Sequence, residues 1–121
     1  MRVLVCGGRD YDDWDNFNDT MQKINATFDE IGNITMIGHG GASGADTMAG
    51  IWATHNCIPT KVYKVTQDDW KKLGRAAGPI RNARMLKEFQ PDVLVAFPGG
   101  RGTGDMVQRA TAAGVKVIEV Y

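Results

Sequence analysis

The stretch "DVLVAFPGGRGTGD" (92–105) sets the architecture of this chain, because an apolar run passes directly into a glycine-rich turn. The short apolar run 92–97 predicts a buried strand. The turn 98–105 leads into a segment that we expect to be helical to about Ala113, where Gly114 ends it. Four glycines in nine residues indicate a backbone that approaches something closely.

The same order of strand, turn and helix recurs along the chain. Further apolar runs predict strands at 2–6, 34–38, 60–65 and 116–120. Apolar spacing of three and four predicts a helix from Asp12 or Asp13 through Phe28 and Ile31 to Gly32. Other helices are expected at 45–55 and 79–89, and the polar segment 66–78 is expected to be an irregular flap. Regular alternation of this kind indicates an α/β fold, in which helices cover both faces of a mostly parallel five-stranded sheet.

The composition limits the class of protein. A chain of 121 residues predicts one domain, 1–121. Its 14 basic and 14 acidic residues give no net charge, which argues against a nucleic-acid partner. No apolar run approaches the roughly 20 residues of a membrane span, and the N-terminal run is too short for a signal peptide. We therefore expect a cytoplasmic protein without a membrane partner. Cys6 and Cys57 are expected to be buried thiols, and no residue cluster calls for a metal or a cofactor.

Three glycine-rich turns follow strands and should meet at one edge of the sheet. Parallel sheets bind ligands outside the carboxyl ends of their strands, and a glycine loop before a helix offers N–H groups to phosphate. The first turn supplies Gly7, Gly8, Arg9 and Asp10, and the second supplies Gly40, Gly41, Ser43 and Gly44. The third supplies Pro98, Gly99, Gly100, Arg101, Gly102 and Thr103. Arg81 and Arg101 add positive charge, and the fork of an arginine matches phosphate.

Three aspartates that follow these turns, Asp10, Asp46 and Asp105, have two possible roles. Each carboxylate could hold a ribose hydroxyl or act as a general base, or it could simply start a helix. His39 could donate to phosphate or have a structural role, and Trp70 could stack on a base or anchor the flap. The motif ending in Gly-Lys-Ser/Thr and the dinucleotide motif G-x-G-x-x-G are both missing, which argues against an ordinary ATPase, GTPase, NAD enzyme or FAD enzyme.

Four segments together resemble the YspA/YpsA-related branch of the SLOG superfamily. They are "RVLVCGGRDY" (2–11), "HGGASGADTMA" (39–49), "GRAAGPIRNARM" (74–85) and "FPGGRGTGDMV" (97–107). Relatives of this branch include the lonely-guy phosphoribohydrolases and DprA-like DNA-processing proteins. The resemblance implies a Rossmann-like three-layer sandwich that binds nucleotides or molecules derived from them, and it suggests a homodimer or a higher homo-oligomer. Some members cleave an N-glycosidic bond, and others sense nucleotide signals.

The resemblance carries over unevenly to the catalytic residues. The phosphoribohydrolase motif PGGxGTxxE matches at Pro98, Gly99, Gly100, Gly102 and Thr103, but its catalytic glutamate falls on Met106. Asp105 lies one residue earlier, which on a helix turns its side chain by about 100°. Arg81 falls on the family's catalytic arginine and Met85 on a nearby methionine, whereas the neighbours Ile80 and Asn82 depart from that motif. Arg81 and Asn82 are both candidate ligand contacts.

Three functions remain open. The first is a sensor or sequestering protein that binds a nucleotide or a nucleotide-derived molecule through its phosphate loops. The second is an N-glycoside hydrolase acting on nucleoside monophosphates or related nucleotides, with Arg81 and either Asp105 or Asp46 as catalytic residues. The third is a DprA-like DNA-processing accessory. Whether the protein is an enzyme is left undecided by the sequence, because Met106 cannot perform acid–base chemistry.

Overall fold

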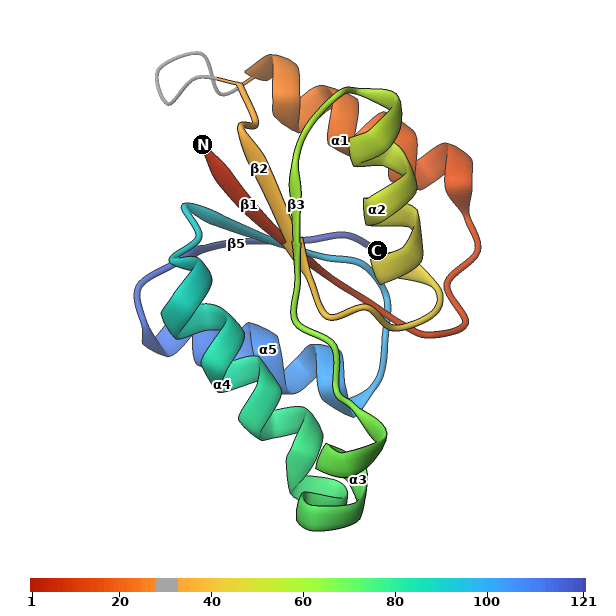
Figure 1. Cartoon of the computed structure of the whole chain (residues 1–121). Coiled ribbons are helices and arrows are strands. Elements are labelled where there is room, and N and C mark those ends of the chain that lie inside the picture. Colours follow the sequence, from red (N-terminus) through yellow and green to blue (C-terminus); the bar gives the residue numbers. More distant parts are fainter. Residues whose placement is uncertain (28–32) are drawn as a thin grey trace.

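The computed structural model describes residues 1–27 and 33–121 and contains one five-stranded sheet (Figure 1). Its strands are β1 (Arg2–Cys6), β2 (Met36–His39), β3 (Thr60–Val62), β4 (Val93–Ala96) and β5 (Lys116–Glu119). They lie in the order β3-β2-β1-β4-β5, and every pairing is parallel. The predicted α/β, Rossmann-like fold is therefore confirmed, with a sheet that is parallel throughout.

Helices cover both faces of this sheet (Figure 1). The helices α1 (Trp14–Thr27) and α2 (Ala45–His55) pack on one face, and α4 (Ala77–Phe89) and α5 (Arg101–Ala112) pack on the other. Side chains of β1 alternate between the two layers: Val3 and Val5 join the first core, and Leu4 joins the second. Because both faces are buried, the central strands are apolar without interruption.

The start of α1 agrees with the sequence prediction. The Asp13 carboxylate accepts a hydrogen bond from the backbone N–H of Asn16 at 3.0 Å, which is the geometry of an N-cap. The predicted continuation through Phe28 and Ile31 to Gly32 lies outside the described residues.

The segment 66–78 is helical, and the prediction of an irregular flap was wrong. Helix α3 (Gln67–Leu73) is followed by the 3₁₀ turn η1 (Gly74–Ala76) and then directly by α4. A capping box starts α3: the Thr66 hydroxyl accepts from the Asp69 N–H at 3.1 Å, and the Asp69 carboxylate accepts from the Thr66 N–H at 3.0 Å. No residue of α3 is buried, and its two large apolar residues, Trp70 and Leu73, are both 40% exposed, so hydrophobic spacing gives only a weak signal for this helix.

The two cysteines differ from each other. Cys6 is buried at the end of β1, as expected, whereas Cys57 is exposed, so the expectation of two buried thiols was half wrong. Within residues 1–27 and 33–121, no helix is both long enough and apolar enough to cross a bilayer.

Candidate functional site

The three glycine-rich turns interlock at the carboxyl edge of the sheet. The Gly8 N–H donates to the Pro98 carbonyl at 2.8 Å, and the Gly8 carbonyl accepts from the Ala45 N–H at 3.2 Å. A Cβ at Gly44, whose φ is +73°, would lie 2.2 Å from the Gly8 oxygen. A Cβ at Gly99 would lie 2.7 Å from the Gly8 nitrogen. These glycines are thus required by contacts between the loops themselves.

A pocket of about 200 Å³ opens beside the second turn. Gly40, Gly41 and Ser43 form one wall, and Arg9, Lys64, Arg81 and Trp70 complete the lining. The Arg9 guanidinium lies over the Trp70 ring at 6.0 Å from its centre. The backbone N–H groups of Ser43 and Gly44 find no acceptor among the described residues. The pocket therefore combines three cations with free N–H groups next to the start of α2, which is an environment suited to an anion.

Arg81 is held from several sides. Its Nη1 donates to the carbonyls of Gly40 at 2.8 Å and Tyr63 at 3.3 Å, and its Nε donates to the Asn82 side-chain oxygen at 3.1 Å. A Cβ at Gly40 would lie 2.2 Å from Arg81 Nη1, so this glycine leaves room for the guanidinium.

Asp46 is buried in the first turn of α2 behind this pocket. Its carboxylate accepts a hydrogen bond from the Ala42 N–H at 3.1 Å. Burial raises the pKa of Asp46 from 3.8 to about 6, and this effect outweighs the stabilisation of the carboxylate by the Ala42 N–H and by the positive charges of Arg81 and Arg9. A carboxyl group with such a pKa can accept or donate a proton near neutral pH.

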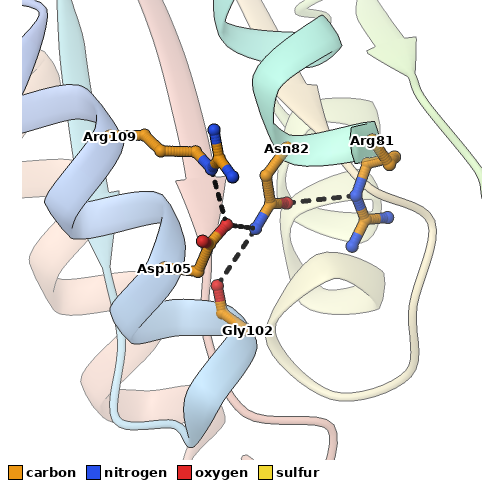
Figure 2. A network of polar contacts seen from close by, with 5 residues as sticks. All are labelled: Arg81, Asn82, Gly102, Asp105 and Arg109. Carbon is orange, nitrogen blue, oxygen red and sulfur yellow. Dashed lines mark hydrogen bonds and ion pairs between the residues drawn. The ribbon is translucent and has the colours of Figure 1, made fainter. Parts of the chain in front are cut away.

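Asp105 lies between α4 and α5, in a hydrogen-bond network that reaches Arg81 through Asn82 (Figure 2). The Asn82 amide nitrogen donates to Asp105 at 3.0 Å and to the Gly102 carbonyl at 3.1 Å, and Arg109 Nε donates to Asp105 at 2.9 Å. Met106 of α5, which falls on the glutamate of the phosphoribohydrolase motif, is fully buried in the core between the sheet and the helices α4 and α5. Of the two aspartates considered as catalytic, Asp46 is thus next to the pocket, and Asp105 is bonded to two side chains outside its lining.

The remaining predicted site residues lie around the same edge. The Ser43 hydroxyl donates to the Arg9 carbonyl at 3.2 Å. Gly100 precedes α5, and a Cβ at Gly100 or at Gly102 would meet open space. Arg101 and Asp10 are exposed, and neither lines the pocket, so their contact with a ligand stays a prediction.

A larger open groove of about 520 Å³ runs between α2 and β3. Ile51 and Val62 contribute to its mostly apolar wall, and His39 and Asp46 also line it. His39 Nδ1 accepts a hydrogen bond from the Gly41 N–H at 3.0 Å, and burial lowers the pKa of this imidazole, so it is neutral near pH 7. We place the candidate site in the smaller pocket, because Arg9, Lys64 and Arg81 all line it.

Sequence reasoning did not single out Lys64. A signal for it existed, because Lys64 follows β3 and the carboxyl ends of parallel strands share one edge. Among the described residues, no group of three or more His, Cys, Asp or Glu side chains could hold a metal ion.

The fold and the pocket together define a Rossmann-like α/β protein with a cationic pocket where its strands end. Residues 1–72 match the model of the YspA, cpYpsA-related SLOG family, and the chain belongs to this family. The resemblance found in the sequence is thereby confirmed.

Known proteins extend this similarity over the rest of the chain. The Gene 61 protein of Mycobacterium phage D29 is 35% identical over 127 residues, which covers 97% of this chain and 94% of that protein. An X-ray structure of the protein TM1055 shares the fold with a TM-score of 0.67 at 17% identity, over 97% of this chain and 72% of that one.

DNA processing protein A (DprA) from Streptococcus pneumoniae shares the fold with a TM-score of 0.53 at 18% identity. The match covers 97% of this chain but only 58% of the DprA chain.

Proposed function

We propose that this protein binds a nucleotide or a nucleotide-derived molecule, and that its phosphate lies in the pocket lined by Arg9, Lys64 and Arg81. The observation that carries the proposal is the excess of positive charge at this pocket: three cations line it, and the Asp46 carboxyl lies behind it, close enough to interact with Arg81 and Arg9. The two ion pairs among the described residues, Arg84–Glu88 and Arg109–Asp105, include none of the three cations. A pocket in which cations outnumber carboxylates favours an anionic ligand.

The size of the pocket supports a ligand with two parts. Pockets that enclose a drug-sized molecule hold about 300–1,000 Å³, whereas this one holds about 200 Å³. We infer that the phosphate end is enclosed and that the remainder extends over the rim. Trp70 is 40% exposed at that rim and offers an aromatic face to a base.

A role in sensing or sequestering the ligand is the first choice within this proposal. Met106 is buried at the position that the phosphoribohydrolase motif gives to its glutamate, and Asp105 is bonded to Asn82 and Arg109. Neither side chain is therefore available for acid–base chemistry in the pocket.

Hydrolysis of an N-glycosidic bond is the second candidate, and Asp46 is the observation that favours it. Its pKa of about 6 would let it protonate a leaving base, and the charge of Arg81 lies nearby. In this case Asp46, rather than Asp105, would be the acid.

One experiment tests both candidates. The protein is incubated with nucleoside monophosphates, ADP-ribose, NAD and cyclic nucleotides, and the bound and free fractions are separated by HPLC. A ligand recovered intact from the bound fraction supports binding. Free base that accumulates beyond one equivalent supports hydrolysis, which Asp46→Asn should then abolish.

Variants locate the site. Arg9→Ala and Arg81→Ala should each weaken binding by about tenfold or more, because hydrogen bonds to charged groups contribute about 1.5–3 kcal/mol. Arg84→Ala is the matched control, since Arg84 is an exposed arginine of the same helix as Arg81 and does not line the pocket. If the folded Arg9→Ala/Arg81→Ala double variant binds as tightly as the unaltered protein, the site is elsewhere.

A further inference from the structure

The hydrogen bonds of Arg81 leave one of its nitrogens unused. Nε donates to Asn82, and Nη1 donates to the carbonyls of Gly40 and Tyr63. Nη2 has no partner among the described residues. A guanidinium can offer a fork through Nε and Nη2 or through Nη1 and Nη2, and each fork has lost one member here. The two-pronged phosphate contact expected from the sequence is therefore blocked, and Arg81 presents Nη2 alone.

The orientation of the Asn82 amide has a single solution. Asn82 is 4% exposed, and its amide faces a carboxylate, a backbone carbonyl and an Nε–H group (Figure 2). The first two only accept hydrogen bonds, and the third only donates. The Asn82 NH₂ group must therefore point to Asp105 and Gly102, which leaves its oxygen toward Arg81.

Arg109 supports the far end of this chain of contacts. Its Nε donates to the Asp105 oxygen that also accepts from Asn82. The path from Arg109 through Asp105 and Asn82 thus connects α5 to the side chain in the pocket (Figure 2).

We propose that Asn82 is a positioning residue that holds Arg81 so that Nη2 faces the anionic group of the ligand, with Asp105 and Arg109 fixing the Asn82 amide. The proposal rests on the function proposed above. It assigns Asp105 a structural role in place of the acid–base role considered from the sequence. It also explains why a half-buried guanidinium keeps one orientation before any ligand arrives, which reduces the cost of ordering on binding.

The first test concerns the protein without ligand. Proton exchange with water at Arg81 Nε is followed by ¹⁵N–¹H NMR in the unaltered protein, in Asn82→Ala and in the control Arg84→Ala. We expect slow exchange in the unaltered protein and in the control, and fast exchange in Asn82→Ala. Equally fast exchange in all three proteins would overturn the proposal, whatever ligand the protein binds.

A second variant tests the same chain of contacts in case Asn82→Ala, a change at a buried residue, does not fold. Arg109→Met alters a partly exposed side chain, removes the N–H donor to Asp105 and leaves Asn82 in place. It should speed exchange at Arg81 Nε relative to the unaltered protein. Unchanged exchange in Arg109→Met would show that Arg109 does not help to position Arg81.

The second test uses AMP as the probe and measures affinity by calorimetry. Asn82→Ala should weaken AMP binding by about tenfold and should cause no further loss in an Arg81→Ala background, because it acts through Arg81. An equal loss in both backgrounds would refute the positioning role. If the unaltered protein binds neither AMP nor the other nucleotides, the proposed function fails, and the NMR test still decides whether Asn82 holds Arg81.

Discussion

Replacing Asp46 by asparagine should stabilise the protein at neutral pH. The pKa of Asp46 is raised by burial from 3.8 to about 6, so the folded protein binds this proton more tightly than the unfolded chain does. Stability from this group is fully present below pH 3.8 and is lost as the pH rises through 6. A pKa difference of about 2 corresponds to about 3 kcal/mol, which is the cost of a charged Asp46 above pH 7. Asparagine keeps an oxygen that can accept from the Ala42 N–H and carries no charge.

The assay is urea unfolding of both proteins at several pH values, followed by tryptophan fluorescence. The free energy of unfolding of Asp46→Asn minus that of the unaltered protein should grow by about 2.5 kcal/mol between pH 4 and pH 7.5, because a small part of the total change already occurs below pH 4. Taking this difference removes the titration of all other groups. Asp10→Asn is the matched control, because Asp10 is exposed, and its difference should stay flat. A flat difference for Asp46→Asn as well would refute the reasoning that burial raises this pKa.

Three further predictions test the packing around the site. Gly44→Ala should lower the free energy of unfolding by more than about 2 kcal/mol, since a left-handed φ alone costs about 1–2 kcal/mol. Gly104→Ala, whose Cβ meets open space inside α5, should raise the free energy of unfolding by about 0.5–1 kcal/mol. Chemical denaturation measures both, and a Gly44→Ala protein of normal stability would contradict the loop geometry. Cys57 should react with a thiol reagent at pH 7.5 in the native protein, and Cys6 should react only after unfolding, because burial raises the pKa of Cys6 to about 12. Mass spectrometry after labelling counts the modified thiols, and two labels on the folded protein would contradict this prediction. AMP should change the tryptophan fluorescence of the unaltered protein but not that of Trp70→Phe, because the other tryptophans do not line the pocket. An equal change in both proteins would show that the base does not bind at Trp70.

The sheet and its flanking helices could be predicted because their residues are buried in regular patterns. The central strands are apolar on both faces, and Asp13 marks the start of α1. Helix α3 escaped prediction because none of its residues is buried, although Thr66 and Asp69 have the spacing of a capping box. The capping-box spacing therefore indicated helix α3, whereas hydrophobic periodicity did not.

The location of the candidate site could be predicted from the sequence, but the hydrogen-bond partners of its residues could not. The loops meet at one edge because all strands are parallel, which the alternation of elements implied. The bonds of Asn82 to Asp105 and to Arg81 join residues up to 23 positions apart. The Asn82–Asp105 bond depends on how α4 packs on α5, which no local pattern in the chain specifies, whereas Arg81 and Asn82 are neighbours on α4 itself. Burial of Asp46 beside Gly40 depends in the same way on how α2 meets the edge of the sheet.

The interlocked glycine turns also determine where this protein can be re-engineered. A side chain at Gly8, Gly44 or Gly99 would collide with backbone atoms of a neighbouring turn, so a library that varies these positions would mostly yield misfolded protein. The segment 66–76 packs without a buried residue and still supplies Trp70 to the pocket. Changes in ligand preference should therefore be sought by randomising 66–76 while keeping Thr66, Asp69 and Gly74, which cap α3, and leaving the glycine turns unchanged.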